Sequence, residues 1–111
     1  MKVIKRNGEQ VPFESEKIFN VIVKAMRETE IGVDLLMAGN IAEEIYKLAK
    51  DKSEPMNIEE IQDLVEELLM KKGRYEVAKR YILYREERNQ LRGTDKYSKY
   101  KFLSDNFLSR Y

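Results

Sequence analysis

Hydrophobic and polar residues alternate in two short segments at the start of the chain, residues 2–6 and 9–13, with the pair Asn7-Gly8 between them. An Asn-Gly pair in this position is a strong signal for a β-hairpin, because both residues of its two-residue turn adopt positive φ angles. The pattern therefore predicts an N-terminal hairpin with one apolar face.

The two-residue turn also predicts which residues of the hairpin lie opposite one another. The expected pairs are Lys2 with Phe13, Ile4 with Val11 and Arg6 with Glu9. In this register Ile4, Val11 and Phe13 share the face that covers a core. Lys5 and Gln10 are then expected on the opposite face.

After the hairpin, apolar residues recur every three or four positions in four successive segments, which is the period of amphipathic helices. These positions are Ile18, Ile22, Ala25 and Met26; Leu35, Ala38, Ile41, Ala42, Ile45, Leu48 and Ala49; Ile58, Ile61, Leu64, Val65, Leu68 and Leu69; and Val77, Ala78, Tyr81, Ile82 and Tyr84. The pattern predicts four helices, the last of them over residues 75–91.

Residues with capping preferences mark the ends of these helices. Ser15 can cap the first helix, and the second is expected to begin near Asp34. Asn57 followed by Glu60 resembles a capping box at the start of the third helix. Gly73 fits the position just past the end of that helix, where a left-handed backbone is common.

A short third strand is expected at residues 55–57, between the second and third helices. A lone hairpin is only marginally stable in water, so the hairpin should lie across an end of the helices. We therefore predict an α+β fold: a four-helix bundle capped by a small β-sheet that is built on the N-terminal hairpin. The chain of 111 residues suits one such domain.

Composition excludes several kinds of chemistry. The chain has no cysteine and no histidine, which removes thiolate nucleophiles, cysteine-based zinc sites and the commonest general base. Apolar residues make up 42% of the chain, as in globular proteins, and no apolar run is long enough to cross a bilayer. A cytoplasmic protein with no membrane partner is the expectation.

Three cations are the candidate chemistry of the hairpin region. Lys5 and Arg6 directly precede the predicted turn, and Lys17 falls in the first turn of the first helix. A helix N-terminus offers unpaired N–H groups and a positive dipole end, so cations gathered there would suit a polyphosphate. Solvated surface charge is the simpler interpretation of the same residues.

The residues around these cations resemble a known family. The segment VIKRNGEQVPFESEKI, residues 3–18, is similar to the opening signature of ATP-cone domains: a hydrophobic residue, Lys-Arg-x-Gly, a Val-x-Phe strand and a Lys-Ile pair that opens a helix. The similarity continues in IEEIQDLVEELLMKKGRYEVAKRYILYREER, residues 58–88, with its Ile-Gln-Asp-x-Val-Glu segment and its later tyrosines. The resemblance covers roughly residues 2–92.

The resemblance implies a domain that binds ATP or dATP as an allosteric effector beneath the cap. Magnesium would accompany the triphosphate, without direct ligands from the protein. By the same resemblance the phosphates lie near Lys5, Arg6 and Lys17, with Arg88 of the last helix as a further cation.

Three more residues are assigned to the nucleotide by the resemblance. Val11 and Ile58 would frame the base and the sugar. Glu14 stands where related domains carry a polar residue. Its carboxylate is expected either to accept from ribose or adenine, or to repel a second nucleotide.

ATP-cones occur mostly at the N-terminus of ribonucleotide reductases, where ATP favours the active enzyme and dATP an inhibited state. The tail, residues 93–111, resembles the start of a reductase catalytic region, with the anaerobic, triphosphate-reducing type favoured. We therefore expect a regulatory domain in residues 1–92 that is not itself an enzyme, either part of a larger reductase or a stand-alone cone. Its expected partners are a reductase catalytic domain or subunits, and a homo-oligomer is also allowed.

Two other classes of function remain open. Residues 1–70 carry 9 Lys and Arg against 15 Asp and Glu, whereas residues 71–111 carry 12 against 5. The basic, tyrosine-rich second part could track a nucleic acid, although that partner is disfavoured. The acidic segment IEEIQDLVEELL could instead dock a basic protein in an interaction module.

Overall fold

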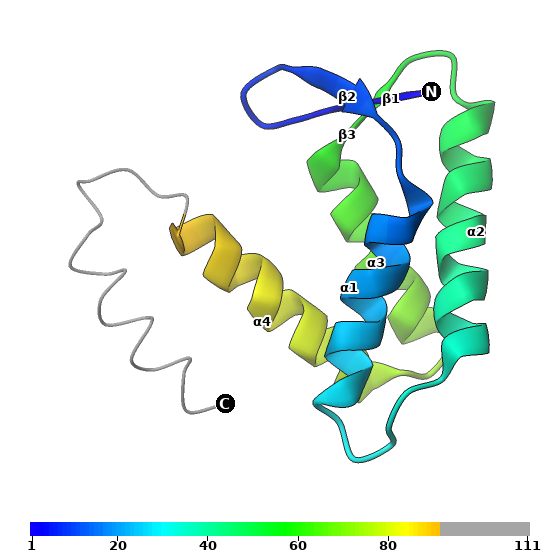
Figure 1. The fold of residues 1–111 in the computed structure, drawn as a ribbon, viewed down its shortest axis with the longest axis vertical. Helices are drawn as coiled ribbons and strands as arrows, with labels where there is room; N and C mark the ends of the chain where they lie inside the picture. The colour runs from blue at the N-terminus through cyan, green and yellow to red at the C-terminus, as the bar shows by residue number, and fades with distance from the viewer. Residues whose placement is uncertain (92–111) are drawn as a thin grey trace. The chain divides into compact units, whose positions relative to one another are not determined.

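The computed structural model describes residues 1–91, so the predicted tail and Arg92 lie outside the described residues. Within residues 1–91 the chain forms three strands and four helices (Figure 1). They are β1 (Lys2–Ile4), β2 (Gln10–Pro12), α1 (Ser15–Arg27), α2 (Leu35–Asp51), β3 (Met56–Asn57), α3 (Ile58–Lys71) and α4 (Tyr75–Leu91). The predicted α+β class, the third strand and the four helices are all confirmed.

The chain divides into two compact units, Met1–Tyr81 and Ile82–Tyr111. The first unit holds the sheet, α1, α2, α3 and the first turns of α4. The described part of the second unit is the remainder of α4, up to Leu91.

The sheet has the strand order β2-β1-β3, with β1 antiparallel to β2 and parallel to β3. Val3 in the central strand is the register partner of both Val11 and Met56. Partners in register point to the same face of a sheet, and Val3 and Met56 are 5% and 3% exposed. This face is therefore the one that covers the core.

The predicted hairpin register is wrong by one residue. The observed pairs are Lys2 with Pro12, Val3 with Val11, and Ile4 with Gln10. The loop has three residues, because Lys5 N donates to Glu9 O at 2.8 Å and Gly8 N donates to Lys5 O at 2.9 Å. Only Gly8 in this loop has a positive φ, of 86°. A turn followed by a left-handed glycine is the usual three-residue hairpin loop.

The side chain of Asn7 explains the longer loop. Its Oδ1 accepts from Glu9 N at 3.0 Å, which is the turn that Asn makes with the backbone two residues later. As a consequence, Lys5 lies on the same face of the hairpin as Val3 and Val11. The prediction that put Lys5 on the face away from the core is therefore wrong.

The core of the first unit is formed by the stripes that the apolar spacing predicted. The largest fully buried side chains are Ile22, Met26, Ile41, Ile45, Val65, Leu69 and Val77. Leu35 and Leu48 were expected in the α2 stripe but are 60% and 46% exposed. Both lie at the edges of the arc that Ala38, Ile45 and Ala49 bury, so the core covers them only in part.

The helix ends follow the capping signals except at α1. Asp34 caps α2, its Oδ1 accepting from Met37 N at 3.0 Å. Gly73 has φ 77° and lies just past α3, as predicted. Ser15 is instead the first residue of α1, and the preceding residue makes no side-chain capping bond. The prediction that Ser15 caps α1 is wrong, because the helix begins one residue earlier than a Ser15 cap requires.

Candidate functional site

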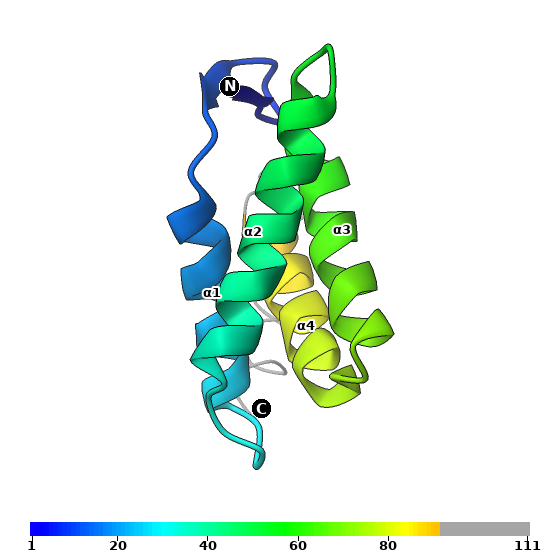
Figure 2. The same ribbon diagram turned by 90° about the vertical axis from the view of Figure 1, so that its right-hand side faces the viewer.

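The sheet lies across the end of the helices at which α1 and α3 begin (Figures 1 and 2). Chain connectivity places both helix starts there, because α1 begins three residues after β2 and α3 begins directly after β3. The sheet is also attached to α2: the rings of Phe13 and Tyr46 are 5.9 Å apart and tilted by 58°. Two helix N-termini, each favourable for anions, therefore lie at the sheet.

Two of the three predicted cations pair with carboxylates close to them in the chain. Lys5 Nζ is 3.8 Å from Glu9 Oε2 across the hairpin loop. Lys17 Nζ is 2.9 Å from Glu14 Oε2 at the start of α1. The lysine side chains are 52% and 81% exposed, so each pair adds little stability, and both ammonium groups are open to solvent and to ligands.

Arg6 makes a different kind of pair. Its Nη2 is 2.7 Å from Oε1 of Glu59, in the first turn of α3. The two side chains are 32% and 41% exposed, and the pair joins the hairpin loop to a helix that is remote in sequence. Sequence reasoning missed Glu59. The available signal was an acidic residue in a helix first turn, which is common at any helix start.

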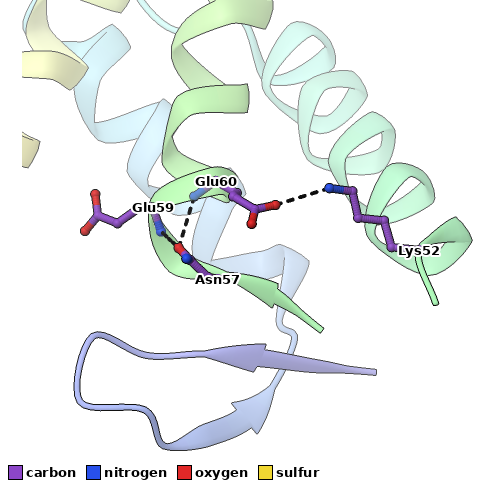
Figure 3. A network of polar contacts seen from close by, with 4 residues as sticks. All are labelled: Lys52, Asn57, Glu59 and Glu60. Carbon is purple, nitrogen blue, oxygen red and sulfur yellow. Dashed lines mark hydrogen bonds and ion pairs between the residues drawn. The ribbon is translucent and has the colours of Figure 1, made fainter. Parts of the chain in front are cut away.

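The start of α3 is firmly fixed. Asn57 Oδ1 accepts from Glu59 N at 2.9 Å and from Glu60 N at 3.4 Å (Figure 3). The predicted capping box is confirmed in its Asn57 half. In a capping box the side chain of Glu60 would accept from the main-chain N–H of Asn57. It instead contacts Lys52 Nζ at 3.2 Å, just past the end of α2.

Ile58, which was predicted to frame the base, begins the same helix and is half-buried, as is Val11 of β2. Gln62 lies four residues after Ile58, so the two share a helix face. The Oε1 of Gln62 is buried and accepts no hydrogen bond from residues 1–91. A buried amide oxygen without a donor costs about 1–3 kcal/mol, so this atom is suited to a ligand donor. Sequence reasoning did not single out Gln62.

Two predicted site residues do not join this cluster in the expected way. Glu14 is half-exposed, and the contact found for it is with Lys17. Arg88 lies in the last turn of α4, which belongs to the second unit, and its role near the phosphates stays a prediction.

Within residues 1–91, no three or more acidic side chains come together as a metal site. Across the same range, every helix is too short or too polar to span a bilayer.

Comparison with known protein families decides the class of the domain. The profile of the ATP cone domain family matches residues 1–90, which is most of the chain. The chain belongs to the ATP-cone family. Members of this family are nucleotide-binding regulatory domains, so the cations around the cap belong to a nucleotide-binding domain.

Several curated proteins are similar to this ATP-cone. A vitamin B12-dependent ribonucleoside-diphosphate reductase of Thermoplasma acidophilum is 44% identical over 96 residues, covering 82% of this chain and 12% of that protein. The alpha subunit of a Chlamydia trachomatis ribonucleoside-diphosphate reductase is 36% identical over 102 residues, covering 83% and 10%. An anaerobic ribonucleoside-triphosphate reductase of Haemophilus influenzae is 35% identical over 91 residues, covering 81% and 13%. The chain thus spans about a tenth of the length of these relatives.

In this ATP-cone, carboxylates of the protein contact all three predicted phosphate cations. Each of the three predicted phosphate cations has a carboxylate within 4 Å: Glu9 for Lys5, Glu59 for Arg6 and Glu14 for Lys17. A triphosphate that binds here must therefore compete with carboxylates of the protein for the same donors.

Proposed function

We propose that this ATP-cone binds ATP and dATP between the hairpin cap and the starts of α1 and α3, and that the nucleotide regulates a ribonucleotide reductase. In this proposal the phosphates contact Lys5, Arg6 and Lys17, with Arg88 as a further cation. Val11 and Ile58 frame the base and the sugar. Magnesium binds through the triphosphate.

The observation that carries the proposal is the meeting of Arg6 with the first turn of α3. The hairpin loop brings a guanidinium, which suits phosphate oxygens, to the helix that also carries Gln62. The buried Oε1 of Gln62 lacks a donor among residues 1–91, and the exocyclic amino group of adenine or a ribose hydroxyl would supply one. A phosphate donor set and a base or sugar acceptor thus belong to neighbouring elements.

The register of the hairpin supports the same site. Lys5 lies two residues after Val3 and opposite Glu9, on the face of the hairpin that covers the core. Its ammonium group can therefore reach under the cap, whereas the predicted register would have directed it away. Lys17 lies in the first turn of α1, where the side chain of the N-cap residue Glu14 makes no capping bond.

The reductase context is inferred from the relatives. Proteins that share this domain include B12-dependent, diphosphate-reducing and anaerobic triphosphate-reducing reductases. We infer that the ATP-cone acts in a cytoplasmic reductase, as a regulatory rather than a catalytic part, through a catalytic domain, partner subunits or a homo-oligomer. The anaerobic, triphosphate-reducing type is the predicted parent. ATP then favours the active enzyme and dATP the inhibited one, because each binds the two states with different affinity.

A melting-temperature titration of the 111-residue chain tests the proposal. ATP and dATP should each raise the melting temperature progressively with free ligand, whereas GTP, CTP and inorganic triphosphate should raise it less. If adenine nucleotides stabilise the chain no more than inorganic triphosphate does, the site binds phosphate alone and the effector proposal fails. If binding weakens steeply with salt and ignores the base, a general polyanion site replaces it.

A further inference from the structure

The pair between Arg6 and Glu59 differs from the other two ion pairs of the cap. Lys5 and Lys17 each contact a carboxylate three or four residues away in the chain. Arg6 contacts a carboxylate on another element, at 2.7 Å, and both side chains are more than half buried. This contact is the shortest of the three and ties the hairpin loop to α3.

A guanidinium offers five N–H donors in a planar fork, and each edge of the fork matches one carboxylate or one phosphate group. The Nη2 donor of Arg6 is held by Glu59, so a phosphate that binds Arg6 through this side of the fork must displace the carboxylate. Breaking the Arg6–Glu59 pair costs free energy, and phosphate binding is weaker by that amount. The carboxylate is also released from the loop at that moment.

We propose that Glu59 is a built-in competitor for the phosphate-binding Arg6. Binding of a nucleoside triphosphate exchanges the Arg6–Glu59 pair for an Arg6–phosphate pair, and the exchange frees the first turn of α3 from the hairpin loop. Glu59 therefore sets the nucleotide affinity of the ATP-cone and links phosphate binding to a change at the α3 surface. This inference rests on the proposed function.

The neighbouring residue provides a matched control. Glu59 and Glu60 both lie in the first turn of α3, and both main-chain N–H groups are held by Asn57. Their side chains point in opposite directions, Glu60 toward Lys52 and Glu59 away from it (Figure 3). Glu59→Gln and Glu60→Gln remove the same charge from the same helix end, and only the first removes a partner of Arg6.

The experiment measures the affinity of the 111-residue chain for ATP and for inorganic triphosphate by calorimetric titration, in the wild type and in these two variants. Glu59→Gln should bind both ligands more tightly, by up to about five-fold, because a partly exposed pair is worth roughly 0.2–1 kcal/mol and 1.4 kcal/mol is a tenfold change in affinity. Glu60→Gln should change both affinities by clearly less. Adenosine, which has no phosphate, should bind the wild type and Glu59→Gln equally.

A double-mutant cycle with Arg6→Gln separates competition from general electrostatics. In the Arg6→Gln background, Glu59→Gln should bring no more gain than Glu60→Gln does. Three results overturn the inference: equal or weaker triphosphate binding in Glu59→Gln, an equal gain in both Gln variants, or a gain that persists without Arg6. If the wild type binds neither ATP nor triphosphate, the proposed function fails together with the inference, whereas the three results above leave that function standing.

Discussion

The two helices that begin at the sheet start in different ways. At α1 the side chain of Glu14, the N-cap residue, makes no capping bond, and its carboxylate is occupied by Lys17 in an exposed local pair. At α3 the first turn is capped by Asn57 and also contacts Arg6 of the hairpin loop. The start of α3 is thus held by a cap and by a contact with the hairpin loop, whereas the start of α1 has an exposed cation and lacks a capping bond from Glu14.

The two helix starts would therefore contribute differently to nucleotide binding at the cap. In the proposed site, the capped start of α3 holds the hairpin loop through the Arg6–Glu59 pair until a triphosphate displaces Glu59. In the same proposal the start of α1 supplies the ammonium group of Lys17, whose pair with Glu14 is mostly solvated and therefore costs little to break. The substitutions below test whether the two helix starts differ in this way.

The largest effect is expected when the open cations are removed. Lys5→Ala combined with Lys17→Ala should weaken ATP binding at least about tenfold, since hydrogen bonds to charged groups are worth roughly 1.5–3 kcal/mol each. The free energy of unfolding should change by less than about 1 kcal/mol, because both side chains are more than half exposed. Titration calorimetry and urea denaturation measure the two quantities.

A matched control removes two lysines from the C-terminal ends of α1 and α3. Lys24 and Lys71 lie in the last turns of α1 and α3, away from the sheet. Lys24→Ala with Lys71→Ala should leave ATP binding nearly unchanged. Equal losses in the two double variants would mean that ATP responds to total charge and not to the cap.

The next effect concerns the stability of the two helix starts. Asn57→Ala should lower the free energy of unfolding by about 1 kcal/mol, because it removes the acceptor of two main-chain N–H groups. Ser15→Ala should change it by less than about 0.5 kcal/mol, since Ser15 does not cap α1. Urea denaturation compares both variants with the wild type, and a large loss in Ser15→Ala would remove the contrast between the helices.

The smallest effect is expected at Glu14. Because its partner Lys17 is 81% exposed, Glu14→Gln should change ATP affinity by less than about twofold, and less than Glu59→Gln does. The ratio of ATP to dATP affinity should stay the same. A selective loss of ATP binding in titration calorimetry would instead assign Glu14 to the ribose, as one of the sequence-based interpretations has it.

The helices of this fold were predictable because each depends on local signals. The apolar stripe of α3, the Asn57 cap and Gly73 are all readable within a few residues of one another. The hairpin register was not, because Asn7-Gly8 suits a two-residue turn as well as a three-residue loop. The side-chain bond from Asn7 to the main chain decides between them.

The candidate site was predictable only in part, for a related reason. Lys5, Arg6 and Lys17 stand out in the sequence as cations near a turn and a helix start. Glu59 and Gln62 became candidates only through the fold. Glu59 contacts Arg6 of the hairpin loop, and the side-chain oxygen of Gln62 is buried without a donor from residues 1–91. The sequence near each of these two residues does not reveal such contacts.

The most direct test of nucleotide binding at the cap is a map of backbone amide NMR shifts of the 111-residue chain on addition of ATP. If ATP binds at the cap, the largest changes fall in the hairpin loop, residues 5–9, and in the first turns of α1 and α3. Residues 28–34, which connect α1 to α2 at the other end of these helices, should change little. Saturating ATP that leaves the hairpin loop and both helix starts unshifted, or shifts only residues outside them, would contradict the account.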